Sequence, residues 1–192
     1  MAPMGPSRKE VEIKLPFGSS EEAIRRLQQL GAVLTHPREF EDNLVYDLPS
    51  GELRASGRIL RLRRAGQEAK VTFKSKVFRE TRHKVRLEHE TSVGSAHETE
   101  QIFQGLGLGV TYRYQKYRSV YELASVEVSV DETPIGCFVE LEGEPDAIDR
   151  LAERLGFKVE DYIQATYRDL HETNAASRGV PMGDLVFADG ET

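Results

Sequence analysis

Charged and aliphatic residues alternate along several short stretches of this chain. Between residues 10 and 14, Glu10, Glu12 and Lys14 alternate with Val11 and Ile13. Because side chains on a β-strand point alternately to opposite faces, this stretch predicts a strand with one charged and one aliphatic face. The same alternation recurs over residues 59–63, 70–76, 84–90, 114–118, 126–131 and 139–142. The pattern therefore predicts seven strands of the same two-faced kind.

Three other stretches, residues 19–31, 95–107 and 145–156, have the spacing of amphipathic helices. The first two begin with a serine followed three residues later by a glutamate, which is a helix-capping signal, and the third begins at a proline. Each ends in Leu-Gly, and glycine commonly terminates helices. Helices between strand-like segments predict an α+β domain, in which the aliphatic face of an antiparallel sheet packs against them. The charged face then either lies open to water or curls inward around a wet cavity.

The length of 192 residues suits one domain, which we expect to cover residues 9–173. We expect a flexible N-terminus over residues 1–8 and a flexible tail over residues 174–192, because neither stretch has a periodic pattern. The chain contains no apolar run near the ~18 residues of a membrane helix. It therefore predicts a cytoplasmic protein without a membrane span. The single cysteine, Cys137, excludes an intramolecular disulfide, in keeping with a reducing compartment.

The formal net charge is −6, which argues against a general nucleic-acid-binding protein. The middle of the chain differs from this total, because from Arg58 to Arg86 eleven lysines and arginines accompany only two glutamates. Several of these cations share a strand face, so they would repel one another unless an anion lay between them. The middle of the chain therefore predicts an anion-binding surface.

Acidic residues gather in other parts of the chain. Asp131 and Glu140 flank residues 133–136, a turn-forming segment that predicts a hairpin and draws the two carboxylates together. A polyphosphate with divalent cations would satisfy both charged groups, because arginine and lysine bind phosphate oxygens while carboxylates bind Mg²⁺ or Mn²⁺.

Taken in chain order, the charged motifs resemble the CYTH superfamily of triphosphate tunnel metalloenzymes. The motifs are Glu-x-Glu-x-Lys at residues 10–14, Leu-Arg-Leu-Arg at 60–63, Thr-x-Lys at 72–74, Arg-x-Glu-x-Glu at 86–90, Lys-x-Arg at 116–118, Asp131, and Glu-x-Glu at 140–142. The resemblance implies an antiparallel eight-stranded β-barrel, with helices packed outside and a triphosphate bound inside.

The resemblance also implies roles for individual residues. The phosphates would be bound by Lys14, Arg61, Arg63, Lys74, Arg86, Lys116 and Arg118. Mg²⁺ or Mn²⁺ would be bound by Glu12, Asp131, Glu140 and Glu142. The catalytic set would be Glu10, Glu12, Lys14, Glu88 and Glu90. Within that set, Glu88 and Glu90 would orient basic neighbours or help to bind metal.

The resemblance is compatible with two reactions. Class IV adenylate cyclases convert ATP to cyclic AMP and pyrophosphate, and their chains close with a segment similar to Ala165–Leu170. The short layout and this segment favour a cyclase. A phosphohydrolase would instead direct water at an outer phosphate of inorganic, thiamine or nucleoside triphosphate.

Three further possibilities stay open. The chain could be a binding module for polyphosphate or nucleotides, although anion binding alone needs no carboxylates. The charges could also be solvated surface without a function. Finally, the protein could form a homodimer.

Other motifs carry less information. The five histidines lack the spacing of zinc ligands. The glycine-rich stretch Gly105–Gly109 follows a predicted helix, whereas a nucleotide-binding loop precedes one, so we interpret it as a helix end. The tyrosines between Tyr112 and Tyr121 could stack on RNA bases, but packing is the more common role of a tyrosine-rich strand.

Overall fold

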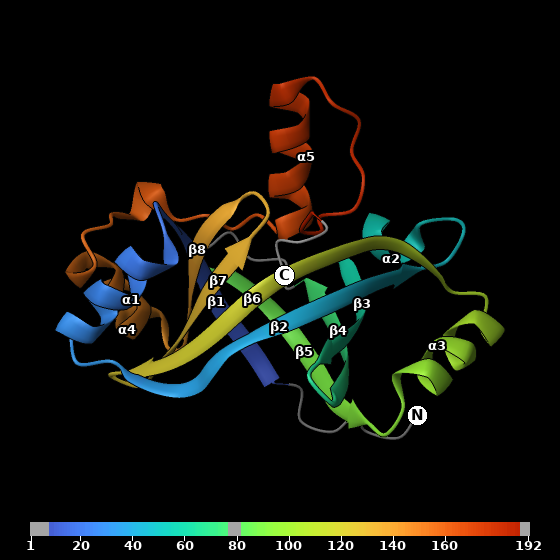
Figure 1. The fold of residues 1–192 in the computed structure, drawn as a ribbon, viewed down its shortest axis with the longest axis horizontal. Coiled ribbons are helices and arrows are strands. Elements are labelled where there is room, and N and C mark those ends of the chain that lie inside the picture. The colour runs from blue at the N-terminus through green and yellow to red at the C-terminus, as the bar shows by residue number, and fades with distance from the viewer. Residues whose placement is uncertain (1–7, 77–81, 189–192) are drawn as a thin grey trace.

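The computed structural model describes residues 8–76 and 82–188, which form one closed antiparallel sheet surrounded by helices (Figure 1). The strands are β1 (Arg8–Phe17), β2 (Val33–Asp47), β3 (Arg58–Ala65), β4 (Glu68–Lys76), β5 (Lys84–Val93), β6 (Gly109–Leu123), β7 (Val126–Thr133) and β8 (Gly136–Glu142). The helices are α1 (Ser20–Gln29), α2 (Glu52–Ala55), α3 (Ala96–Gly105), α4 (Pro145–Arg154) and α5 (Tyr167–Arg178). The strand order around the ring is β1-β5-β4-β3-β2-β6-β7-β8, and β8 pairs with β1. The α+β fold and the eight-stranded antiparallel barrel are thereby confirmed.

The aliphatic faces of the strands point outward and form the main core with two of the helices. Ile13, Val128 and Leu141 of β1, β7 and β8 pack with Leu27 of α1 and Ile148 of α4, and each is at most 1% exposed. Fully burying one such side chain contributes roughly 1.5–3 kcal/mol. Because outward positions alternate with inward ones, this packing turns the charged face of each strand toward the inside of the ring.

A smaller core lies at the other end of the long axis in Figure 1, under α3. Phe103 of this helix meets Tyr46 of β2 edge to face, with ring centroids 4.9 Å apart. Leu62 of β3 is fully buried in the same cluster. The helices therefore cover two separate outer faces of the sheet.

The three predicted helices are confirmed as α1, α3 and α4. The side chains of Ser19 and Ser95 accept hydrogen bonds from backbone N–H groups three residues later, as the capping signal predicts. At the other end of each helix, Gly31, Gly107 and Gly156 adopt positive φ angles of 87°, 82° and 89°. Glycine reaches this left-handed conformation without steric cost, so the Leu-Gly pairs do terminate the helices.

Strand β2 is absent from the seven strands that the alternation predicts. It is 15 residues long, and its pairing with β6 shifts register between Leu34 and His36, between His36 and Glu39, and between Val45 and Tyr46. Each shift moves the following side chains relative to their partners, so a strict two-residue period is lost. Only the family resemblance implied an eighth strand.

Residues 174–188, where the sequence predicts a flexible tail, include the end of a helix and a segment docked on β6. Helix α5 continues to Arg178, and Leu185 is only 2% exposed. Leu185 forms a parallel bridge with Tyr114, with backbone hydrogen bonds to Arg113 and Gln115. The predicted flexible residues 1–7 and the last residues, 189–192, lie outside the described residues.

Two smaller observations complete the fold. Cys137 is a free, buried cysteine. Among the described helices, none combines the length and the apolar character needed to cross a membrane.

Candidate active site

A cavity of about 630 Å³ lies inside the ring of strands. All eight strands and the segment from Gln164 to Asp169 contribute lining residues, and we call this space the tunnel cavity. Of the described residues that line it, twelve are lysine or arginine and seven are aspartate or glutamate. The charged strand faces therefore curl inward, and the alternative of an open, solvated sheet face is excluded.

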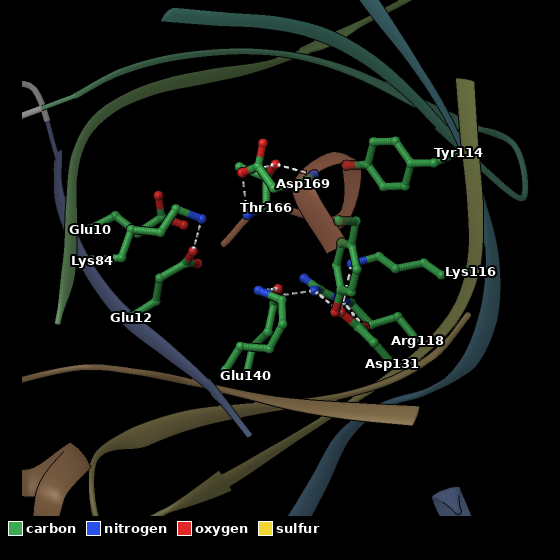
Figure 2. A network of polar contacts seen from close by, with 12 residues as sticks. Glu10, Glu12, Lys84, Tyr114, Lys116, Arg118, Asp131, Glu140, Thr166 and Asp169 are labelled. Carbon is green, nitrogen blue, oxygen red and sulfur yellow. Dashed lines mark hydrogen bonds and ion pairs between the residues drawn. The ribbon is translucent and has the colours of Figure 1, made fainter. Parts of the chain in front are cut away.

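The inward row of β1 supplies three charges to the tunnel cavity. Lys74 Nζ donates to Glu10 Oε1 at 2.6 Å, and Lys84 Nζ donates to Glu12 Oε1 at 2.5 Å. Lys14 Nζ lies 2.8 Å from Glu140 Oε1. Figure 2 shows Glu10, Glu12 and Lys84 side by side on one wall of the cavity. Each β1 charge thus meets an opposite charge from another strand.

Burial and these partners act in opposite directions on the β1 carboxylates. Burial raises the pKa of Glu10, and Lys74 only partly offsets it, so the pKa is above its ordinary value. Burial also opposes ionisation of Glu12, but Lys84, Lys14 and Lys74 together outweigh it and lower the pKa to about 2. Glu12 is therefore held as a carboxylate, the form that binds a metal ion.

Asp131 of β7 is the centre of a dense hydrogen-bond network on the opposite wall (Figure 2). It is fully buried and accepts from Lys116 at 3.0 Å, from Tyr167 at 2.5 Å, and from two nitrogens of Arg118 at 2.6 Å. Arg118 also donates to Glu140. Both oxygens of Asp131 are occupied, so this residue is built to hold its basic neighbours in place.

A second network crosses strands β3, β4, β5 and β6. Arg61 Nη2 donates to Thr72 Oγ1 at 3.0 Å, and Thr72 Oγ1 donates to Glu90 Oε2 at 2.8 Å. Arg61 Nη1 donates to Tyr114 Oη at 3.1 Å. Burial opposes the charge on Arg61, but the phenol and carboxylates around it raise its pKa, so it stays a cation. The network fixes one guanidinium at the wall of the tunnel cavity.

Glu41 of β2 is a charged residue that the sequence analysis missed. It is 5% exposed, and its carboxylate lies 3.1 Å from Arg63 and 3.6 Å from Lys116. Burial would raise its pKa, but Lys116 and Arg63 hold the pKa well below the ordinary value. A correct prediction of β2 would have identified Glu41 as a site residue, because it pairs in register with Lys116 of β6. Lys84, Thr72, Tyr114 and Tyr167 were also missed.

The remaining predicted residues complete the set. Glu88 lies 3.5 Å from Lys74 Nζ, and Arg86 reaches the carbonyl oxygen of Gly57 at 3.5 Å. Glu142 lines the tunnel cavity at the end of β8. Eleven of the fourteen predicted site residues line the cavity, and the other three, Glu88, Glu90 and Asp131, each contact a cation that does. The structure therefore brings the whole predicted set to one place.

Carboxylates suitable for a divalent metal lie where β1 meets β8. Glu12 is directly opposite Glu142 in the strand register, and Glu140 is two residues further along. All three line the cavity and offer the oxygen ligands that Mg²⁺ and Mn²⁺ prefer. Among the described residues, no three such side chains already converge as a metal site, since Glu12 and Glu140 point at basic neighbours. The donor set fits a metal ion once these pairs exchange partners, whereas Asp131 does not fit.

Comparisons with known proteins agree with this geometry. The model of the CYTH domain family matches residues 8–174. Among solved structures, a conserved hypothetical protein from Pyrococcus furiosus is 24% identical, with a TM-score of 0.70 and 82% of this chain and 97% of that chain covered. A proposed adenylate cyclase from Vibrio parahaemolyticus is 17% identical, with a TM-score of 0.72 and 86% and 98% covered.

A third solved structure is a proposed adenylyl cyclase from Hippeastrum, described as revealing a dominant triphosphatase activity. It is 16% identical, with a TM-score of 0.64 and coverage of 91% of this chain and 97% of that chain. Among curated proteins, none matches this chain.

Proposed function

The chain belongs to the CYTH domain family, and from this membership we propose that it is a metal-dependent enzyme that cleaves a triphosphate in the tunnel cavity. The observation that carries the proposal is the convergence of oppositely charged side chains from eight strands on one cavity of about 630 Å³. Among the described residues, twelve basic and seven acidic side chains line that cavity. Glu88, Glu90 and Asp131 pair with lining cations without lining the cavity themselves, so the surface that faces the cavity is predominantly basic and suits a polyanion.

The paired charges of the tunnel cavity suit a polyanion that arrives together with a metal ion. The pairs Lys14–Glu140, Lys74–Glu10 and Lys84–Glu12 all have distances of 2.5–2.8 Å. A phosphate that takes the cation of such a pair leaves a buried carboxylate uncompensated, which is costly. A divalent cation removes that cost by taking the carboxylate. Because each pair can exchange its partners for a phosphate and a metal ion, the pairs favour a metal-dependent enzyme over a module that binds only anions.

We assign the phosphates to the seven predicted cations, Lys14, Arg61, Arg63, Lys74, Arg86, Lys116 and Arg118. Arginine and lysine hold phosphoryl oxygens by charge-assisted hydrogen bonds and stabilise negative charge that develops during cleavage. The carboxylates of Glu10, Glu41, Glu88 and Glu90 would orient these cations. Asp131 would do the same for Lys116 and Arg118, in place of the metal-binding role that the resemblance implied.

Glu12, Glu140 and Glu142 would hold Mg²⁺ or Mn²⁺. When bound, such an ion neutralises phosphoryl charge and polarises the bond to be broken. Basic neighbours keep the carboxylates of Glu12 and Glu140 ionised, since Lys84 helps to lower the pKa of Glu12 and Lys14 with Arg118 lowers that of Glu140.

Between the two reactions, we place hydrolysis first. A cyclase must also position a nucleoside, yet the cavity end next to α2 and α5 is lined by Arg54, Arg58 and Arg168. These basic surroundings suit another phosphate group of the substrate better than a purine base. The dominant triphosphatase activity described for the Hippeastrum protein is consistent with that choice.

Adenylate cyclase activity is the second candidate, and one observation favours it. The segment that resembles the closing segment of class IV cyclases is Ala165–Leu170, and its residues 165–169 line the tunnel cavity. Its position would let it contact a nucleotide.

The proposal is tested by incubating the purified protein with tripolyphosphate, ATP or thiamine triphosphate, each with Mg²⁺ or Mn²⁺, and separating all products by chromatography. We expect orthophosphate, and a variant with Glu140→Ala should produce far less of it. Glu132→Ala is the matched control, because Glu132 pairs with the exposed Arg38 outside the cavity. Cyclic AMP with pyrophosphate would favour the second candidate, whereas no turnover of any triphosphate would contradict both.

A further inference from the structure

The donors and acceptors of the hydrogen bonds around Arg61 can be assigned, and the assignment leaves the phenolic proton of Tyr114 without an acceptor among the described residues. A carboxylate only accepts, so Thr72 must donate its hydroxyl proton to Glu90. Thr72 Oγ1 then accepts from Arg61, whose guanidinium has donors only. For the same reason Tyr114 Oη must accept from Arg61. The phenolic proton of Tyr114 is therefore available for donation elsewhere.

The surroundings of Tyr114 direct that proton to the tunnel cavity. Tyr114 lines the cavity, and Figure 2 shows its hydroxyl pointing inward from β6. Among the residues that the structure describes, no hydrogen-bond acceptor receives the proton. The charged and titratable groups around the hydroxyl are Arg61 and Arg63 of β3, Lys116 and Tyr112 of β6, and Tyr167 of α5. A donor among three cations suits an anionic acceptor.

We propose that Tyr114 is a substrate-binding residue whose hydroxyl donates a hydrogen bond to a phosphoryl oxygen of the bound triphosphate. This inference rests on the proposed function and adds a neutral donor to the seven predicted cations. Arg61 holds the phenolic oxygen from one side, so the donor is already oriented before substrate binds. Preorganisation of this kind lowers the entropic cost of binding.

A tyrosine on the same strand provides the contrast. Tyr117 is an odd number of residues from Tyr114, so it points to the opposite face of β6. Its ring packs against Phe40, Phe187 and the guanidinium of Arg38, at centroid distances of 5.3, 5.4 and 3.5 Å. Tyr117 has the packing role that the sequence analysis gave to all of these tyrosines, and Tyr114 departs from it.

The first experiment compares Tyr114→Phe with Tyr117→Phe, which each remove one hydroxyl. Calorimetry measures the affinity for inorganic tripolyphosphate, and initial rates with Mg²⁺ give kcat and KM. For Tyr114→Phe we expect Kd and KM to rise about tenfold, which is the loss of one hydrogen bond to a charged group. We expect Tyr117→Phe to match the wild type in both quantities, and both variants to keep the wild-type Tm within a few degrees.

The outcomes separate this inference from the function beneath it. Wild-type affinity in Tyr114→Phe, or equal weakening in both variants, would overturn the role of Tyr114 and leave the proposed function intact. If the wild-type protein neither binds nor cleaves a triphosphate, the proposed function fails and this inference fails with it.

A second measurement uses only the wild-type protein, so it does not depend on whether a variant folds. Burial opposes ionisation of Tyr114, but Arg61, Lys116 and Arg63 outweigh it and lower its pKa. A phosphate oxygen that accepts a hydrogen bond from the phenol stabilises its protonated form, and must therefore raise the pKa of Tyr114 again. The chain has no tryptophan, so tyrosinate absorbance is not obscured. At about pH 9, below the usual tyrosine pKa of about 10, adding tripolyphosphate should reduce tyrosinate absorbance in the wild type. An unchanged spectrum with bound tripolyphosphate would contradict the proposal.

Discussion

The two faces of β1 share one backbone but are stabilised in different ways. On the outer face, Ile13 and Leu15 are buried among aliphatic side chains of several elements. On the inner face, Glu12 and Lys14 are also buried, but each is paired with an oppositely charged residue, Lys84 or Glu140. The outer contacts are non-directional and follow the area buried, whereas the inner ones are pairwise. Substitutions on the outer face should therefore affect stability, and those on the inner face should affect stability and function together.

The largest effect should come from breaking an inner pair. Lys14→Met keeps the length of the side chain but leaves Glu140 without its 2.8 Å partner. We expect a loss of about 3 kcal/mol in the free energy of unfolding, and about a hundredfold loss of kcat for triphosphate cleavage. Urea unfolding and steady-state kinetics measure the two effects. A variant that loses stability but keeps full activity would break the link between them.

A substitution on the outer face should lower the free energy of unfolding by a similar amount but leave kcat unchanged. Leu141→Ala removes a fully buried side chain from the core under α1 and α4. We expect a loss of about 2–5 kcal/mol in the free energy of unfolding, with the kcat of the folded fraction unchanged at low temperature. Leu106→Ala is the matched control, because Leu106 is 68% exposed and should change stability by no more than about 0.5 kcal/mol.

Glu41 tests whether inner pairs depend on pH as well as on geometry. Because Lys116 and Arg63 lower its pKa in the folded state, Glu41 contributes stability above its ordinary pKa of 4.5 and loses it as the pH falls further. At neutral pH, Glu41→Gln should lower the free energy of unfolding by about 1–3 kcal/mol. Below pH 4.5 the difference from the wild type should narrow. A difference that stays constant down to acid would contradict the ionic role of Glu41.

The smallest effect should come from an ion pair outside the ring. Arg38 Nε lies 2.8 Å from Glu132 Oε1, as close as the inner pairs, but Arg38 is 51% exposed. Water and salt screen such a pair, so Arg38→Met should change the free energy of unfolding by less than about 1 kcal/mol. It should leave kcat unchanged. An effect as large as that of Lys14→Met would show that burial does not distinguish the two faces.

The sequence predicted which residues share a face, because the two-residue period is a local property. It thereby identified the charges of β1 and β8 and the helices whose caps are formed by neighbouring residues. Partner choice could not be predicted in the same way, because Glu12 and Lys84 are brought together by the pairing of β1 with the distant β5.

Two particular residues show what local patterns of the sequence do not encode. Glu41 was missed because the register shifts of β2 disturb its period. The resemblance implied a metal-binding role for Asp131, and only the structure shows that Lys116, Arg118 and Tyr167 donate hydrogen bonds to it. Tyr114 and the docked Leu185 likewise depend on contacts between segments remote in sequence.

The closure of the ring by β1 and β8 also has a consequence for the order in which the protein can fold. Of the eight described strands β1 is synthesised first, yet its two neighbours are β5 and β8, and β8 ends at Glu142. A nascent chain shorter than this has Lys14 without Glu140 and an open edge on its first strand. Exposed strand edges favour pairing with other chains, and contacts so remote in sequence form slowly. Ribosome-bound fragments that end before β8 should therefore need protection from aggregation. This need should end once residues 136–142 have left the ribosome and β8 can pair with β1.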